Sequence, residues 1–536
     1  MIYNYKTFRN IIAILILFTL SNCSKKTNLD ENQVFRYNEH SNISSLDPAF
    51  SSTLRNIWPV NQLFNGLVRL DENLNIIPDL AKSWTISKDG LTYNFNIKNE
   101  VYFHESQSFG DDLTRTVNAN DFEFSFERLK NPNLGSPGLW ALKNIKSFKA
   151  ENDSIFTIHL NKPFAAFLGM LSMKYFSVVP KESVLYYGDK FGKNPVGTGP
   201  FKFKKWEENI KLVLRKNNLY FERDSTGTQL PYLEAISITF LPDKKSEFME
   251  FAQKKLDFIN SIDATFKDQL ISREGKLKEN LSNSIRLISG PYLNTEYIGF
   301  FLGNEKNHVN SKKLRQAINY AIDKRKMMKY LRNNVGYPAN NGFIPLGLNN
   351  GLNTNGFNYD IKKAIKLVKE YKQDNKYEKV QITLTSDANY LDIIEFVQRE
   401  LEKIGINISI NIIPASTLRQ GKSTGKFEMF RASWIADYPD SENYLGLFYS
   451  NNLAPNGPNY THFKNNEYDK LFESTYFEQN DKIRKQSYRK LDSIIISNAP
   501  IIPLYYDKVM RFTRKNVIGL NINPINQLNL KNVYKK

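Results

Sequence analysis

Two carboxylates and two aromatic side chains lie close together in the segment Trp434-Ile435-Ala436-Asp437-Tyr438-Pro439-Asp440. A carboxylate on a loop is well suited to holding a cation, and a rigid scaffold often presents its recognition groups on such a loop. Asp437 and Asp440 are also of the residue type that performs acid–base catalysis. Trp434 and Tyr438, beside a turn, are equally compatible with the edge of a hydrophobic core. The segment is therefore a candidate cation site, and its meaning depends on the elements that position it.

The segment is expected to form a loop at the end of a strand. Residues 427–434 form a strand-like run that stops where Pro439 removes a backbone donor. The same proline biases Tyr438 away from helical geometry.

The clearest local unit lies just upstream of this strand. Residues 380–384 alternate between apolar and polar side chains, and so do residues 406–412. Between them lies a helical pattern that ends at Gly405, a residue suited to a C-terminal cap. Its apolar face comprises Ile393, Ile394, Phe396, Val397, Leu401 and Ile404. Strand, helix and strand in this order predict a right-handed βαβ crossover and hence part of an α/β lobe.

Three further segments yield predictions of local structure. Asn120 or Asp121 is expected to cap a helix. Residues 209–215 are expected to form a strand that buries Ile210 and alternate residues after it. The glycine- and proline-rich run 194–200 is expected to be a sharp, rigid connection. It is not a phosphate loop, because no Gly-Lys-Ser/Thr follows it.

Length and composition exclude several classes of protein. The chain has 536 residues, too many for one ordinary core, and its 41% hydrophobic and 13% aromatic content excludes a mostly disordered chain. The net charge is +18, but the basic residues occur as scattered pairs such as Lys204-Lys205. Nucleic-acid binding would require a basic stripe or a recognisable module. We therefore expect no nucleic-acid partner.

The residues used most often in catalysis and metal binding are not grouped in the sequence. The five histidines are far apart, and no His-Glu-x-x-His, Gly-x-Ser-x-Gly, Walker or dinucleotide motif is present. We therefore expect no catalytic residues, no metal ligands and no cofactor.

The N-terminal residues predict export. A short basic region precedes a ten-residue apolar core over residues 11–20, which has the proportions of a signal peptide. The sequence Leu20-Ser-Asn-Cys23 follows, and Cys23 is the only cysteine, so no disulfide can form within the chain. This arrangement resembles a bacterial lipoprotein signal, in which residues 1–22 are removed and Cys23 is lipidated. Residues 23–33 would then form a lipidated tether, whereas an ordinary signal with an unrelated cysteine is the alternative.

The order of short motifs along the chain resembles the extracytoplasmic solute-binding proteins of peptide-type ABC importers, the oligopeptide- and dipeptide-binding lipoproteins of family 5. The motifs are Ser45-Leu-Asp-Pro48, Phe64-Asn-Gly-Leu67, Pro78-Asp-Leu-Ala81 with Trp84, Asp89-Gly90, Ala119 with Asp121, Asn194-Pro-Val-Gly-Thr-Gly-Pro200, Asn218-Leu-Tyr-Phe221, Leu314-Arg-Gln-Ala-Ile-Asn-Tyr-Ala-Ile-Asp323, Trp434 with Asp437, Tyr460 through Asp469, and Pro500 through Tyr506. Each motif is weak alone, but their joint order is highly specific. The chain departs from the pattern at Lys255, where a glycine is common, and at Ser441, which replaces a frequent proline.

This resemblance implies an α/β protein with the two-lobed periplasmic-binding-protein type II fold and an additional inserted subdomain. The first lobe would be discontinuous and would comprise residues 34–66, 187–295 and 506–536. The inserted subdomain would comprise residues 67–186, and the second lobe residues 296–505.

The resemblance also implies a function. A short, extended peptide would lie between the two lobes, bound through its backbone like an added strand. The aspartate three residues after a tryptophan would hold its α-ammonium; here these residues are Asp437 and Trp434, with Tyr438 beside them. The protein would be a non-enzymatic monomer, anchored by lipid in the bacterial cell envelope and facing the periplasm or the exterior. It would deliver its peptide to the transmembrane subunits of an ABC permease and their ATPases.

Two alternatives stay open. Relatives of this family bind nickel complexes, haem or oligosaccharides, so the same fold allows a different cargo. An enzyme or a surface adhesion lipoprotein on the same scaffold is the alternative from another class. Turnover of a bound peptide, or binding that does not close the lobes, would favour that class.

Overall fold

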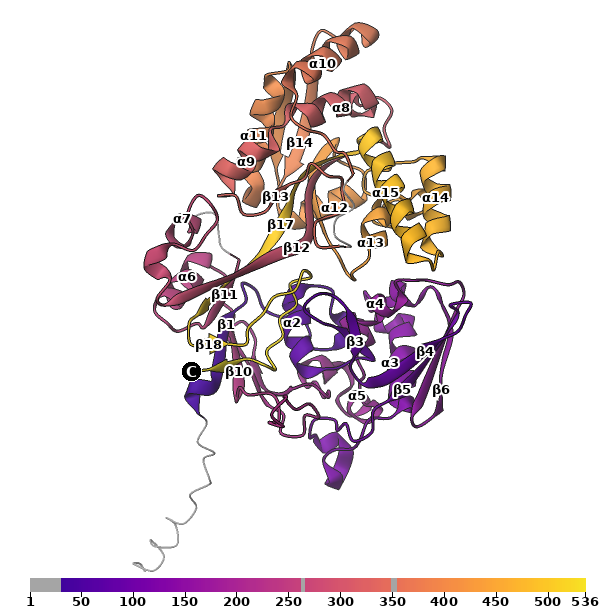
Figure 1. Ribbon diagram of the computed structural model, residues 1–536, viewed down its shortest axis with the longest axis vertical. Coiled ribbons are helices and arrows are strands. Elements are labelled where there is room, and N and C mark those ends of the chain that lie inside the picture. The colour runs from indigo at the N-terminus through magenta and orange to yellow at the C-terminus, as the bar shows by residue number, and fades with distance from the viewer. Residues whose placement is uncertain (1–29, 262–265, 349–353) are drawn as a thin grey trace, which may run out of the picture.

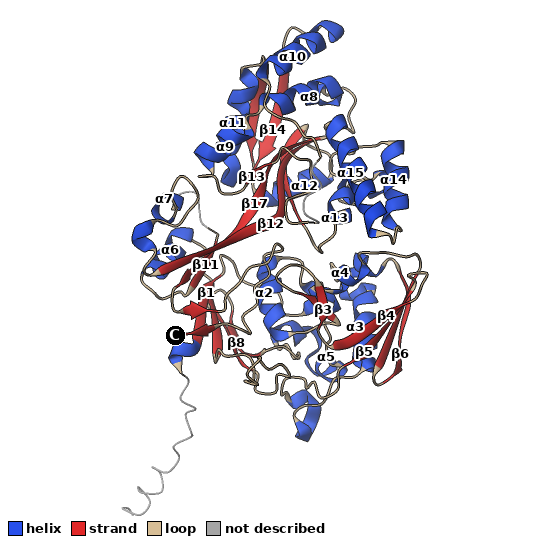
Figure 2. Ribbon diagram, in the orientation of Figure 1, coloured by secondary structure: helices blue, strands red, loops and turns tan. Residues whose placement is uncertain are grey.

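Two lobes joined by long strands make up the computed structural model, which describes residues 30–261, 266–348 and 354–536 (Figure 1). Both lobes contain helices and strands, as the expected α/β class requires (Figure 2). The expected signal peptide and Cys23 lie outside the described residues. No helix in the described ranges is long and apolar enough to span a bilayer.

The upper lobe in Figure 1 is built on a mixed seven-stranded sheet of order β11-β17-β12-β16-β14-β15, with β13 paired to β17. Its strands are β11 (Phe258–Asn260), β12 (Ile285–Phe300), β13 (Tyr337–Pro338), β14 (Val380–Ser386), β15 (Ile406–Ile412), β16 (Met429–Ile435) and β17 (Ile501–Arg514). Strands β14 and β15 are parallel, and helix α11 (Leu391–Glu402) connects them. Gly405 ends this connection with a φ of 78°, so the predicted βαβ unit is confirmed.

Helices cover both faces of this sheet, because alternate strand residues point to opposite sides. Met429 belongs to the hydrophobic cluster under one face and Phe430 to the cluster under the other. The first face carries α8 (Lys312–Ala321), α9 (Lys324–Leu331), α10 (Ile361–Asn375) and α11. The second face carries α12 (Ala415–Ser423), α13 (Glu442–Leu445), α14 (Asn466–Tyr476) and α15 (Asp481–Asn498).

The lower lobe contains two four-stranded sheets with separate hydrophobic clusters. One has the order β1-β10-β9-β8, and the other the order β4-β5-β7-β6. Their strands are β1 (Val34–Asn38), β8 (Phe201–Glu207), β9 (Lys211–Lys216), β10 (Ala235–Thr239), β4 (Ala81–Ile86), β5 (Thr92–Ile97), β6 (Ile145–Asn152) and β7 (Ile155–Leu160). Two short hairpins complete the strands, β2 (Val68–Leu70) with β3 (Ile76–Pro78) and β18 (Val517–Ile518) with β19 (Tyr534–Lys535).

The remaining helices lie in the lower lobe and near the connection between the lobes (Figure 1). They are α2 (Leu54–Leu63), α3 (Ala119–Lys130), α4 (Phe167–Leu171), α5 (Lys181–Tyr187), α6 (Lys244–Ala252) and α7 (Lys267–Leu270). Helix α2 packs in the cluster of the first sheet, whereas α3 and α4 pack in the cluster of the second.

Strands β12 and β17 connect the lobes and pair with each other in antiparallel register (Figure 1). This ladder is interrupted between Pro291 and Thr295. In the gap, the N–H of Leu293 donates to the Pro524 carbonyl at 2.7 Å, while the Leu293 carbonyl accepts from the Ala436 N–H at 3.0 Å. The connection is therefore bonded to the residue that precedes Asp437.

Two local predictions were wrong in detail. Helix α3 is capped by Asn118, because its side chain and that of Asp121 form a reciprocal capping box. The strand expected from residue 209 begins at Lys211. Asn209 has a φ of 59° in a turn, and Ile210 is 63% exposed instead of buried.

The glycine-rich run 194–200 packs directly against the end of helix α2. A Cβ atom on Gly197 would lie 2.1 Å from the Leu63 carbonyl oxygen, and one on Gly199 would lie 2.4 Å from that of Gln62. Close backbone approach, and not a positive φ, is therefore what requires glycine at both positions.

Candidate functional site

The loop that carries Asp437 connects the end of β16 to the start of α13. Asn443, in the first turn of α13, holds this loop in place with one side-chain oxygen. That oxygen accepts from the Trp434 indole N–H at 2.9 Å and from the Asp437 backbone N–H at 3.2 Å. Two of the three predicted binding residues are thus tied to the same amide.

The two carboxylates of the loop have different environments. Asp440 is buried and accepts from the Tyr488 hydroxyl at 2.6 Å and from the Glu442 backbone N–H at 2.9 Å. Its partners lie within the upper lobe, so Asp440 has a structural role. Asp437 has no ion-pair partner among the described residues.

The Asp437 carboxylate faces water on one side and protein on the others. By surface area its side chain is exposed, yet the surrounding protein removes much of its hydration. This desolvation raises the pKa of Asp437 to about 6, although a side-chain hydrogen bond with Asn443 lowers it in part. A desolvated carboxylate that has no cationic partner in the protein is stabilised when a ligand supplies a cation.

A cavity of about 700 Å³ lies between the two lobes beside this carboxylate. Trp434, Asp437 and Tyr438 all line it from the upper lobe. From the lower lobe, Trp140 and Phe164 line the opposite wall. The structure therefore brings the three predicted residues to one cavity with partners that the sequence did not single out. Its volume is in the range of small-molecule sites.

Aromatic contacts join the lobes at the edge of this cavity. Phe164 of the lower lobe stacks on Tyr476 of α14 with a centroid separation of 4.5 Å and an interplanar angle of 8°. Phe164 also meets the Tyr438 ring edge-on at 6.3 Å. Such pairs contribute about 0.5–1.5 kcal/mol each beyond their buried area.

Strand β16 has an unpaired edge that leads to Asp437. It pairs with β12 along its length but with β14 only at its first two residues. Of the flanking residues, the Glu428 carbonyl accepts from the N–H of Phe301, just after β12, and the Ala436 N–H donates to the Leu293 carbonyl of β12. Because bonding direction alternates along an antiparallel strand, the main-chain groups of Arg431, Ser433 and Ile435 point to the other side. No strand in the described ranges pairs with them there.

The charged side chain on this edge is already paired. The Arg431 guanidinium donates to the Glu296 carboxylate at 2.5 Å and lies 3.4 Å from the centroid of the Tyr390 ring. The described residues also contain no group of three or more His, Cys, Asp and Glu arranged to hold a metal.

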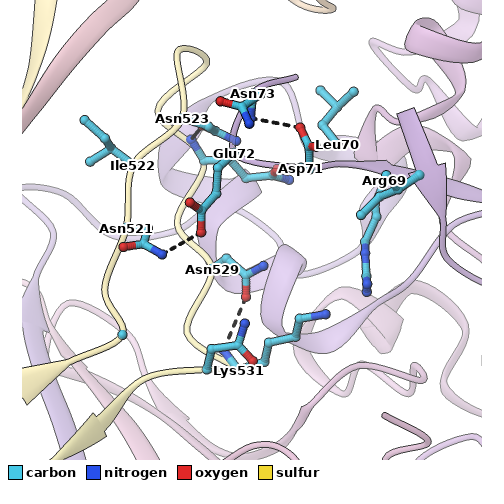
Figure 3. Close-up of a pocket in the computed structure, with 14 residues that line it drawn as sticks. Arg69, Leu70, Asp71, Glu72, Asn73, Asn521, Ile522, Asn523, Asn529 and Lys531 are labelled. Carbon is cyan, nitrogen blue, oxygen red and sulfur yellow. Dashed lines mark hydrogen bonds between the residues drawn. The ribbon is translucent and has the colours of Figure 1, made fainter. Parts of the chain in front are cut away.

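A second cavity, of about 340 Å³, lies in the lower lobe between the β2–β3 hairpin and the C-terminal loop (Figure 3). Asparagine side chains from both segments line it together with Arg69 and Lys531. Both cations already pair with the Glu222 carboxylate. This cavity lies within one lobe and contains none of the residues predicted to bind ligand.

Glu442 and Asn443 were not among the residues predicted from the sequence. A signal for Asn443 was available, since an amide in the first turn of a helix often bonds a preceding loop. The residues of the opposite wall carried no such signal, because they lie about 300 positions away in the chain.

Comparisons with known proteins place these features in context. Residues 75–456 match the family described as bacterial extracellular solute-binding proteins, family 5 Middle. The dipeptide-binding protein of Escherichia coli K12 is 24% identical over 88% of this chain and 88% of that protein. Heme-binding protein A of Haemophilus influenzae is 29% identical over 83% and 81%, respectively.

Among solved structures, the chain is similar to the ABC transporter-associated periplasmic binding protein DppA of Helicobacter pylori in complex with the peptide STSA. The TM-score is 0.78 at 26% identity, and the match covers 94% of this chain and 98% of that one. The expected two-lobed α/β fold is confirmed over nearly the whole length.

Proposed function

The chain belongs to the family 5 bacterial extracellular solute-binding proteins, which are extracytoplasmic receptors of transporters rather than enzymes, and we propose that its cargo is a short peptide. The peptide is captured between the two lobes and handed to an ABC permease. The observation that carries this proposal is the desolvated, cation-free Asp437 carboxylate at the end of the unpaired β16 edge.

The peptide backbone adds as a strand to the edge formed by Arg431, Ser433 and Ile435. Its α-ammonium then pairs with Asp437. Hydrogen bonds to charged groups contribute about 1.5–3 kcal/mol each, whereas ordinary backbone bonds contribute about 1 kcal/mol. The ammonium contact therefore fixes the direction of the peptide, and the edge makes binding tolerant of sequence.

Closure of the lobes follows from contacts that the ligand makes with both. A ligand shifts the equilibrium between open and closed forms only through its different affinity for the two. A peptide on the upper-lobe edge gains contacts with Trp140 and Phe164 only when the lobes are closed, so binding favours closure.

A different cargo is the alternative, since heme-binding protein A is among the relatives. A haem or a nickel complex has no α-ammonium and would leave Asp437 without a partner. The unpaired carboxylate therefore favours peptide.

Attachment of the protein to the membrane rests on Cys23. Removal of residues 1–22 and acylation of Cys23 with two or three chains give stable anchoring, because a single chain holds only marginally. A Cys23→Ser variant is expected in the soluble fraction of lysed cells, and its recovery with the membranes would contradict the anchor.

The test of cargo is calorimetry on the chain from Ser24 onward, with a free tripeptide and its N-acetylated form as matched ligands. We expect the free peptide to bind and acetylation to weaken binding by at least tenfold. An Asp437→Asn variant should lose this discrimination, because only the ammonium uses the carboxylate. Equal affinity for both peptides in the unmodified protein, or no binding of either across a di- to pentapeptide library, would refute the proposal.

A further inference from the structure

A second carboxylate without a cationic partner lines the cavity beside Asp437. Glu442, the first residue of α13, is 8% exposed, and its carboxylate accepts from the Tyr438 hydroxyl. It lines the cavity and has no ion-pair partner among the described residues. Burial, together with the nearby Asp440 and Asp437 carboxylates, raises the pKa of Glu442 to about 7, although the hydrogen bond from the Tyr438 hydroxyl lowers it in part. The charge at this position is thus costly in the unliganded protein.

Aromatic rings line the same cavity as Glu442. Tyr438, Tyr449, Phe472 and Tyr476 line it from the upper lobe, and Phe164 lines it from the lower lobe. Tyr449 and Phe472 lie 4.9 Å apart, and Phe472 and Tyr476 lie 6.2 Å apart. Aromatic rings attract cations through their π faces, most strongly where water is excluded. A desolvated carboxylate among such rings is the combination that recognises an ammonium or guanidinium group.

We propose that this recess, formed by Glu442 and the aromatic rings around it, selects peptides whose first residue carries a cationic side chain, lysine or arginine. The inference rests on the proposed function, because Asp437 must first fix the α-ammonium of the peptide. The first side chain then lies beside Asp437, and the long stems of lysine and arginine reach into the apolar walls while placing their charge at Glu442.

The other charged groups of the cavity are at its exposed rim. Lys143, Lys162 and Glu473 are exposed, and the Lys162 ammonium lies 4.9 Å from the centroid of the Phe477 ring. Charges in contact with bulk water are screened, whereas a charge that is removed from water is not. The recess is therefore anionic, although lysines stand at its entrance.

The experiment compares three tripeptides by calorimetry at pH 7.5: Lys-Ala-Ala, norleucine-Ala-Ala and Ala-Lys-Ala. Norleucine keeps the length of the stem without its charge, and the third peptide keeps the net charge but moves it by one residue. We expect Lys-Ala-Ala to bind at least tenfold more tightly than either of the others.

A Glu442→Gln variant identifies the residue responsible. Glutamine still accepts from the Tyr438 hydroxyl but carries no charge, so affinity for Lys-Ala-Ala should fall to that for norleucine-Ala-Ala. The matched control is Glu467→Gln, on the exposed surface of α14 outside the cavity, which should keep the preference.

The possible outcomes separate the two proposals. If all three peptides bind equally, the inference is overturned while peptide binding stands. If none binds, the proposed function fails as well. If Glu442→Gln does not fold, the ranking of the peptides on the unmodified protein still decides, and retention of the preference in a folded Glu442→Gln protein would exclude Glu442 as its cause.

Discussion

Replacing Asp437 by asparagine should stabilise the unliganded protein. Desolvation raises the pKa of this carboxyl from 3.8 to about 6, so the fold disfavours its ionised form. The stability that the protein gains by keeping this carboxyl protonated is fully present below pH 3.8 and is lost as the pH rises through about 6. At pH 7.5 the unliganded protein therefore holds an unfavourable charge that asparagine does not have.

The size of the effect follows from the same shift. A difference of about two pKa units corresponds to about 3 kcal/mol. The carboxylate faces the water of the cavity, and screening reduces the expected stabilisation to about 1 kcal/mol. The gain should be largest above pH 7, should decrease between pH 6 and pH 3.8, and should vanish below pH 3.8, where the carboxyl is neutral in both the folded and the unfolded protein.

Urea unfolding of both proteins at pH 7.5 and pH 3.5 measures this difference, after bound peptide has been removed by unfolding and refolding. The control is Asp440→Ala, which leaves the Tyr488 hydroxyl and the Glu442 N–H without their acceptor and should destabilise the protein at both pH values. An Asp437→Asn protein that is no more stable than its parent at pH 7.5 would refute the reasoning, because the carboxylate would then be well solvated.

Three further outcomes are expected. Peptide affinity should decrease as the pH falls through about 6, where Asp437 becomes protonated, and calorimetry that shows a constant affinity from pH 5 to 8 would contradict this. Gly197→Ala should lower the free energy of unfolding by about 1–3 kcal/mol, since its Cβ would lie 2.1 Å from the Leu63 carbonyl oxygen. An unchanged thermal midpoint would show that α2 moves to accommodate the added methyl group at no cost. Phe164→Ala removes the stack on Tyr476 and should weaken peptide binding up to about tenfold. Small-angle scattering should show a larger fraction of the protein in the open form. An unchanged affinity and an unchanged radius of gyration would exclude this contact as a contributor to closure.

Elements that depend on local pattern were predictable from the sequence. The β14–α11–β15 unit follows from period-two strands, one apolar helix face and a glycine at its end, and each of these features acts within a few residues. The loop after β16 was also predictable, because Pro439 determines its geometry locally. The cap of α3 was misplaced by two or three residues, because Asn118, Asn120 and Asp121 are all able to cap and only the reciprocal bond decides.

The parts of the site that depend on distant pairing were not predictable. The free edge of β16 exists because β14 overlaps it by only two residues, and no periodicity encodes that overlap. Phe164 meets Tyr476 across more than 300 positions of sequence, and either ring alone is indistinguishable from a core residue. The binding roles of Asp437, Trp434 and Tyr438 and the domain boundaries stay predictions.

The main-chain hydrogen bonds of Leu293 connect the ligand-binding loop to the strands that join the two lobes. Its N–H and C=O groups link the C-terminal loop of one lobe to Ala436, the neighbour of Asp437 in the other. A shift of the Asp437 loop on ligand capture would therefore be transmitted through Ala436 to the interruption in the pairing of β12 and β17. Main-chain atoms form both hydrogen bonds, so this connection does not depend on which side chains are present there. Mutation can therefore retune which cargo is accepted without disabling the response to it.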